Sequence, residues 1–178
     1  MYYKKLVGNQ LYLSPSDIEN ETKILTLWMN EDEQLAIYNG FYGSLVGEEK
    51  VREMLLKWNE GPFLFSIVNK ETNEFMGQVS FFGIDSHEQY ATMGIFLGKD
   101  YRKKGYGKEA IQLAIDYLFK TQRYNAIHLE VFSYNQNAYE MYKKFGFKEC
   151  GRWHQVRYHD GISQDVILME LLREEYYK

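Results

Sequence analysis

The sequence predicts a single α/β (α+β) domain over residues 1–178, and three observations carry this prediction. The 178 residues match the size of one domain, which is long enough to bury most of its apolar surface. Hydrophobic residues make up 45% of the chain and there are only two prolines, so we expect no disordered region. Strand-like and helix-like hydrophobic patterns follow one another along the chain, without an internal repeat or linker.

The first half of the chain shows patterns of three strands and two helices. A strand near residues 9–13 leads into a helix that begins at Ser14-Pro15-Ser16-Asp17, with a cap residue and a proline in its first turn. A second helix is expected from about 48 to 60. Strands at about 63–69 and 74–84 follow, joined by a polar turn.

The second half continues with an apolar run that stops at Gly98, and then with a helix over residues 107–120. An alternating strand at 126–133 comes next, followed by a helix that ends at Gly146. Two strands, at about 147–158 and 164–172, close the chain around the hairpin signal His159-Asp160-Gly161.

The segment that joins the apolar run to the helix is a basic glycine loop. It contains Arg102, Lys103, Lys104, Gly105, Tyr106, Gly107 and Lys108. Glycines let backbone N–H groups turn toward one point, and a helix start adds partial positive charge. These features predict a site for a di- or triphosphate. The spacing is not that of a P-loop, and it departs from the dinucleotide fingerprint. A solvated basic turn is the alternative.

A second motif lies about 30 residues further along, after the 126–133 strand. Asn135 precedes Tyr142 by two helical turns, so both side chains can point to the same side. Gly146 stands where a C-terminal cap belongs. Two purely structural alternatives remain for these residues: Asn135 caps its helix, and Tyr142 is a core residue.

Together the motifs R-x-x-G-x-G and N-x-x-A-x-x-x-Y-x-K-x-G-F resemble the two signatures of the GNAT N-acetyltransferase superfamily. The resemblance covers residues 9–173. Through Trp28-Met29-Asn30 and the closing hairpin, it extends to the branch that acetylates ribosomal-protein N-termini and polyamines. It implies a mixed, mostly antiparallel twisted sheet of about seven strands flanked by about four helices. It also implies acetyl-CoA as co-substrate, and a homodimer or higher homo-oligomer.

The resemblance also implies roles for individual residues. Loop residues 102–108 would bind the pyrophosphate, and Asn135 with Ala138 the pantetheine arm. Backbone N–H groups of Ile95, Phe96 or Leu97 would bind the thioester oxygen, and Tyr142 would give its proton to the departing sulfur. Members of the branch often carry a Glu where this chain has Thr92. The amine proton would therefore leave through ordered water or through Glu130.

Composition and charge indicate which partners and which cellular environment to expect. A net charge of −4 argues against broad nucleic-acid binding, and no run of 18 apolar residues or signal peptide suggests a membrane. A lone cysteine, Cys150, fits a reducing cytoplasm and is expected to be a buried small residue rather than an acyl-carrying nucleophile. The four histidines lack metal-ligand spacing, so we expect no metal.

The acceptor is a small-molecule or peptide amine whose identity the sequence leaves open. The acidic run Glu31-Asp32-Glu33 attracts a cationic amine or is a solvated face. Tyr38, Phe41 and Tyr42 line an acceptor pocket or only pack. Two functions remain: an N-acetyltransferase that transfers directly to a primary amine, or a non-catalytic acetyl-CoA-binding protein that acts through protein contacts.

Overall fold

A computed structural model describes residues 1–39, 43–159 and 161–178. These residues form two compact units. The first unit comprises Met1–Phe81 and Ile95–Ala114, and the second comprises Phe82–Gly94 and Ile115–Lys178. Two strands and one helix contribute residues to both units, and each unit is described separately below.

Eight strands and six α-helices are present in the described residues, which confirms the predicted α+β class. The strands are β1 (Leu6–Val7), β2 (Leu11–Pro15), β3 (Phe63–Asn69), β4 (Phe75–Asp85), β5 (Tyr90–Leu97), β6 (Ala126–Phe132), β7 (Lys148–His159) and β8 (Ile162–Leu172). The helices are α1 (Ile18–Glu31), α2 (Glu33–Tyr38), α3 (Glu48–Asn59), α4 (Tyr106–Asp116), α5 (Gln136–Lys144) and α6 (Arg173–Tyr176). A 3₁₀ turn, η1 (Lys99–Tyr101), and a π-helical turn, η2 (Tyr117–Thr121), flank α4.

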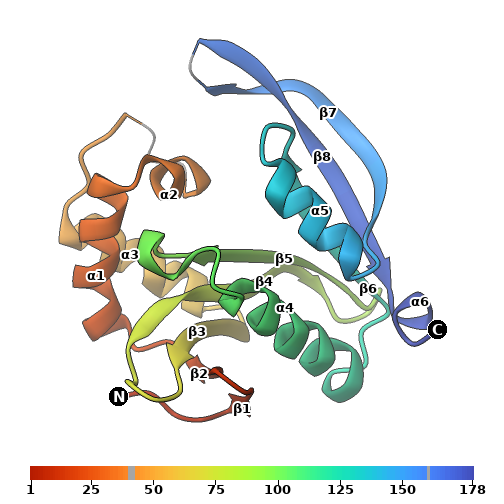
Figure 1. The fold of residues 1–178 in the computed structure, drawn as a ribbon, viewed down its shortest axis with the longest axis horizontal. Coiled ribbons are helices and arrows are strands. Elements are labelled where there is room, and N and C mark those ends of the chain that lie inside the picture. The colour runs from red at the N-terminus through yellow and green to blue at the C-terminus, as the bar shows by residue number, and fades with distance from the viewer. Residues whose placement is uncertain (40–42, 160) are drawn as a thin grey trace. The chain divides into compact units, whose positions relative to one another are not determined.

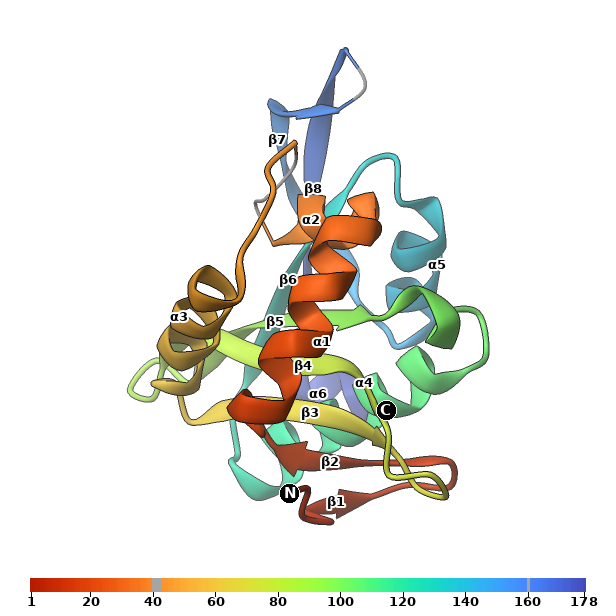
Figure 2. The same ribbon diagram turned by 90° about the vertical axis from the view of Figure 1, so that its left-hand side faces the viewer.

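The first unit is an antiparallel sheet with the order β1-β2-β3-β4, packed against helices α1 and α3 (Figures 1 and 2). The helices face each other and the sheet through apolar side chains at helical spacing. Leu25 and Met29 from α1, Val51 and Leu55 from α3, and Phe75 from β4 form one buried cluster. This cluster holds α1 in place beside the strand that carries Phe75.

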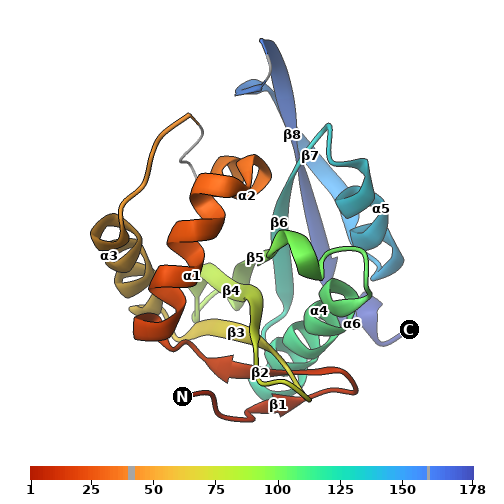
Figure 3. The ribbon, with the colours of Figure 1, turned by 60° about the vertical axis from the view of Figure 1, so that its left-hand side comes forward.

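The second unit contains the order β5-β6-β8-β7, in which the β5–β6 pair is parallel and the other pairs are antiparallel (Figure 3). The strand β6 alternates as predicted: Ile127, Leu129 and Val131 are buried, whereas Glu130 is exposed. Strands β7 and β8 form a long hairpin, and α5 lies alongside it in both Figure 1 and Figure 3.

The beginning of α1 differs from the prediction. Pro15 is the last residue of β2, opposite Phe65 of β3, and not part of a helical turn. The helix begins at Ile18, and Asp17 at its N-cap position makes no side-chain capping hydrogen bond. A proline at the end of a strand fits because it has no N–H to donate to a neighbouring strand.

Short elements account for the other differences. The two-residue β1, the six-residue α2 and the four-residue α6 were not predicted, since such short segments leave no periodic pattern. The predicted helix at 107–120 divides into α4 and the π-helical turn. Strands β7 and β8 pair up to His159 and Ile162, while Asp160 of the hairpin signal lies outside the described residues. Among the described residues, no helix combines the length and apolar character needed to cross a membrane.

Candidate active site

The basic glycine loop lies in the first unit, between the end of β5 and the start of α4. The Gly98 N–H donates to the Met76 carbonyl at 3.0 Å, and η1 then turns the chain. Lys103 and Gly105 both have a positive φ, of 60° and 89°, just before Tyr106 opens the helix. Left-handed residues at a helix start turn successive N–H groups toward one point, where an anion can bind.

The lysines of this loop differ from its arginine. Lys103, Lys104 and Lys108 are exposed, whereas Arg102 is 26% exposed at its side chain and pairs with the Asp32 carboxylate. Its Nε donates to the Leu97 carbonyl at 2.9 Å and its Nη1 to Gln34 Oε1 at 2.8 Å. Asp32 thus neutralises Arg102, which ties the loop to the α1–α2 junction and leaves the three lysines as the exposed cations.

Two glycines near the end of β5, Gly77 and Gly98, allow close packing, whereas Gly107 does not need to be glycine for that reason. A Cβ at Gly77 would lie 2.2 Å from the Phe96 carbonyl oxygen, and one at Gly98 would lie 2.6 Å from the Trp28 ring. Such contacts leave no space for a side chain. A Cβ at Gly107 would instead meet Leu97 Cδ1 at 3.5 Å, which is ordinary contact. The protein itself therefore leaves room for a small side chain at Gly107.

The backbone predicted to bind the thioester oxygen belongs to the half-buried end of β5. Ile95, Phe96 and Leu97 are all partly exposed, and the Phe96 ring packs against Tyr38 at 6.0 Å. In the second unit, the parallel register between β5 and β6 is recorded from Tyr90/Ala126 to Thr92/His128. The oxyanion role of residues 95–97 stays a prediction.

Asn135 and Ala138 come together in the second unit at the start of α5. Asn135 Oδ1 accepts a hydrogen bond from the Ala138 N–H at 3.2 Å, so Asn135 caps the helix as one alternative proposed. At the other end, Gly146 has a φ of 95° and Phe147 N–H bonds back to the Tyr142 carbonyl at 3.2 Å. Both ends of the helix that carries Tyr142 are therefore fixed by local hydrogen bonds.

Tyr142 is buried, with 8% of its surface exposed, and its ring packs edge-on against Phe147 at 5.8 Å. Burial raises the pKa of the Tyr142 phenol to about 12. The hydroxyl therefore keeps its proton at neutral pH. A phenol in this state can donate a hydrogen bond, and it is too weak an acid to serve as a base through its phenolate near pH 7.

Glu130, the predicted base, and Thr92, which stands where members of the branch often carry a Glu, lie on the neighbouring strands β6 and β5. Glu130 is exposed on β6 opposite Leu168 of β8, and Thr92 is half-buried on β5. The Thr92 hydroxyl lies 3.6 Å from the point where a Cβ at Gly83 would stand. Glu130 as base stays a prediction. The loop residues belong to the first unit, whereas Glu130, Asn135, Ala138 and Tyr142 belong to the second.

The three carboxylates of the acidic run Glu31-Asp32-Glu33 differ in their burial. Glu31 and Glu33 are exposed, but Asp32 is buried and also caps α2 by accepting from the Leu35 N–H. The sequence pattern did not predict this internal role of Asp32, because only the folded structure distinguishes the three adjacent carboxylates. Tyr38 packs on Phe96, and Phe41 and Tyr42 lie outside the described residues.

Cys150 was expected to be buried, and this was wrong, since its residue is exposed on the edge strand β7. Partial burial of the sulfur, together with Glu170 nearby, raises the pKa of the thiol. The thiol therefore stays protonated near neutral pH, which is unfavourable for a nucleophile.

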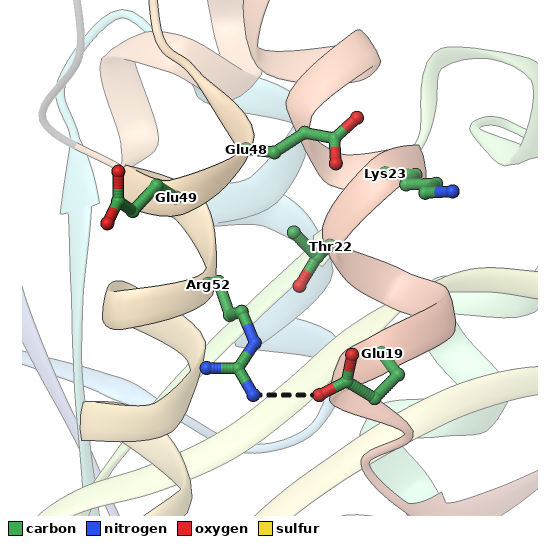
Figure 4. Close-up of a pocket in the computed structure, with 6 residues that line it drawn as sticks. All are labelled: Glu19, Thr22, Lys23, Glu48, Glu49 and Arg52. Carbon is green, nitrogen blue, oxygen red and sulfur yellow. Dashed lines mark hydrogen bonds and ion pairs between the residues drawn. The ribbon is translucent and has the colours of Figure 1, made fainter.

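A polar hollow in the first unit lies between α1 and α3 (Figure 4), and none of its described lining residues is a predicted site residue. Of its two cationic side chains, Arg52 forms an ion pair with Glu19 at 2.8 Å. Within the described residues, no cluster of histidine, cysteine and carboxylate side chains is arranged to hold a metal ion.

Two motifs and this α+β architecture define an acetyltransferase fold. Residues 28–147, more than half of the chain, match the acetyltransferase (GNAT) family, and the chain belongs to this family. The predicted family is thus confirmed.

Sequence identity to individual relatives is low. The chain is 33% identical over 112 residues to the uncharacterized N-acetyltransferase p20 of Bacillus licheniformis, a match that spans 63% of either chain. It is 27% identical over 110 residues to a spermidine N(1)-acetyltransferase of Vibrio cholerae, covering 62% of this chain and 64% of that one. These matches span less than two thirds of either relative.

Solved structures confirm the fold. A GNAT-family acetyltransferase from Bacillus anthracis superposes with a TM-score of 0.81 at 20% identity, covering 98% of this chain and 100% of that chain. The Vibrio cholerae spermidine N-acetyltransferase in complex with CoA and spermine gives a TM-score of 0.83 at 21% identity, covering 96% and 100%.

Proposed function

We propose that this protein transfers an acetyl group from acetyl-CoA directly to a primary amine. The observation that carries the proposal is Tyr142, a buried phenol that keeps its proton, on a helix capped at both ends within the segment that matches the family. A protein that only binds acetyl-CoA has no need of a proton donor beside the sulfur.

The coenzyme would bind through its phosphates at the basic glycine loop. Exposed Lys103 and Lys104 precede α4 and exposed Lys108 lies in its first turn, so their charges and the N–H groups at the helix start would act on the same anion. Arg102 would act differently from the lysines, by holding the loop in shape through Asp32. Asn135 and Ala138 would guide the pantetheine arm.

The amine must lose a proton before it attacks. An alkyl ammonium of pKa about 10.4 is only about 0.1% neutral at pH 7, a deficit of roughly 4 kcal/mol. Glu130, or water ordered by backbone carbonyls, would take that proton. The amine nitrogen then attacks the thioester carbon, whose oxygen would be stabilised by N–H groups of Ile95, Phe96 or Leu97.

The carbon–sulfur bond breaks as the tetrahedral intermediate collapses. Tyr142 would donate its O–H to the departing sulfur as the general acid. Since a thiol has an ordinary pKa of about 8.5, complete transfer from a phenol of pKa about 12 is uphill by roughly 3.5 pKa units. Tyr142 would therefore act mainly through its hydrogen bond, while the proton released by the amine completes the free thiol.

The acceptor we propose is a polyamine-like amine or a peptide N-terminus. Support comes from the name of the Vibrio cholerae relative and from Glu31 and Glu33, which remain exposed beside α2. The decisive test measures release of free thiol from acetyl-CoA across a panel of spermidine-like amines and peptides. Binding of acetyl-CoA with no thiol release above the rate without acceptor, for every amine, would support the non-catalytic alternative.

A further inference from the structure

A second hollow in the first unit has a volume of about 390 Å³, and half of its described lining residues are aromatic. Tyr2, Trp28, Phe75 and Tyr101 all contribute, and they come from the N-terminal segment, α1, β4 and η1. The Trp28 indole stacks on Phe75 at 5.5 Å with 16° between the planes, and Tyr101 tilts against Trp28 at 6.1 Å. Trp28 thus contacts both Phe75 and Tyr101, and these rings form the aromatic surface of the hollow, with Phe75 buried beneath Trp28.

The position of this aromatic surface is rigidly determined. Trp28 lies against Gly98, where a Cβ would come within 2.6 Å of its ring, so the indole occupies the space that a side chain would need. Phe75 is buried in the core cluster of the first unit, and Trp28 packs against the same cluster. The rings are held before any ligand arrives, which lowers the entropic cost of binding.

The charge at this hollow is negative. Glu74 is the charged residue among those that line the hollow in the described part of the chain, and its Oε2 accepts from Thr72 Oγ1 at 3.0 Å. Burial raises the pKa of the Tyr101 phenol, and the carboxylates of Glu74 and Asp100 raise it further. The negative potential that opposes ionisation of Tyr101 favours a cation at the same place.

We propose that this hollow binds a small organic cation, an alkylated ammonium, whose charge is shared between the aromatic faces and Glu74. The faces of Trp and Tyr rings attract such cations, and an alkylated ammonium loses little hydration on leaving water. The polar hollow between α1 and α3 in Figure 4 does not fit this ligand, because its described lining consists of five charged side chains and Thr22 and offers no aromatic face. The proposal stands independently of the acetyl-transfer reaction.

The test compares choline with 3,3-dimethyl-1-butanol, its uncharged isostere, by calorimetry on the whole protein without acetyl-CoA. We expect choline to bind at least tenfold more tightly than the alcohol. Glu74→Gln should weaken choline binding several-fold, while Glu48→Gln in the other hollow should leave it unchanged. Tyr101→Leu should weaken both probes, because it removes part of the shared apolar surface.

Variants of Trp28 are unsuitable, since the ring also supports the core. Glu74 is exposed, so its variant should fold normally. Equal affinity for choline and the alcohol, no detectable choline binding, or a Glu74→Gln variant with unchanged affinity would each overturn the proposal.

Discussion

The Arg102 guanidinium pairs with the Asp32 carboxylate, although 70 residues separate them in the sequence. Arg102 is the first residue of the phosphate-loop motif, and Asp32 is the N-cap of α2. The side chain of Asp32 is only 10% exposed, so this charge has little access to water. One ion pair therefore connects the basic glycine loop with the start of α2.

Removing the Asp32 charge should loosen the basic glycine loop. Asp32→Asn retains a good N-cap residue but leaves Arg102 without its counter-charge, so the free energy of unfolding should fall by on the order of 2 kcal/mol. Acetyl-CoA affinity, measured by calorimetry, should fall several-fold. Glu31→Gln is the matched control, because Glu31 is exposed next to Asp32 and should change neither quantity appreciably. Equal behaviour of the two variants would show that the pair does not shape the loop.

Variants of Gly107 test whether the backbone of the basic glycine loop closely approaches a phosphate of acetyl-CoA. A Cβ there has ordinary contact with Leu97 at 3.5 Å, so Gly107→Ala should fold normally. Gly107→Val should lower acetyl-CoA affinity at least tenfold, about 1.4 kcal/mol, because the side chain blocks the ligand. Gly61→Ala has the same 3.5 Å clearance, to the Trp58 carbonyl, and serves as control. Unchanged binding in a folded Gly107→Val variant would place the coenzyme elsewhere.

The Tyr142→Phe variant distinguishes an acetyltransferase from a protein that only binds acetyl-CoA. Tyr142→Phe removes only the hydroxyl and keeps the ring packed on Phe147. If the phenol assists the departing sulfur, kcat should fall by roughly 10² to 10⁴ while acetyl-CoA binding changes little. Tyr139→Phe on the same helix removes a hydroxyl that bonds to Glu149 at 3.3 Å, and it should keep its turnover. Wild-type turnover in Tyr142→Phe, with chemistry rate-limiting, would reduce Tyr142 to a core residue.

The raised pKa of Tyr142 also predicts how stability depends on pH. The folded-state pKa of about 12 exceeds the ordinary value of about 10, so the folded protein holds this proton more tightly than the unfolded chain. This contribution to stability is complete below pH 10 and is lost as pH rises toward 12. Comparing urea unfolding of wild type and Tyr142→Phe between pH 9 and 12 should show a steeper decline for wild type. Parallel curves would mean that the phenol ionises normally.

The exposed carboxylates next to Asp32 test the nature of the acceptor. Glu31→Gln combined with Glu33→Gln should raise KM for spermidine several-fold at low salt, and the effect should vanish at high salt because exposed charges are screened. Glu48→Gln and Glu49→Gln on α3 provide a charge-matched control. A double variant with unchanged KM at low salt would make Glu31 and Glu33 a plain solvated face.

The sequence by itself determined the features that depend on nearby residues. Alternation along β6 and the apolar spacing of α1, α3 and α5 predicted those elements, because a strand and a helix repeat over a few residues. Asn135 and Gly146 predicted the two ends of α5 for the same reason, since a cap bonds to backbone three or four residues away. The motifs around Gly107 and Tyr142 likewise sufficed to predict the family.

Only the tertiary structure decided which of several similar residues is buried or paired. Asp32 differs from Glu31 and Glu33 because folding brings Arg102 beside it. Cys150 is exposed because β7 is an edge strand, and the order of strands cannot be read from a local pattern. The elevated pKa of Tyr142 and the stacking of Trp28 on Phe75 depend in the same way on burial by distant segments. Desolvation and charge pairing act through space, so residues far apart in the chain determine them.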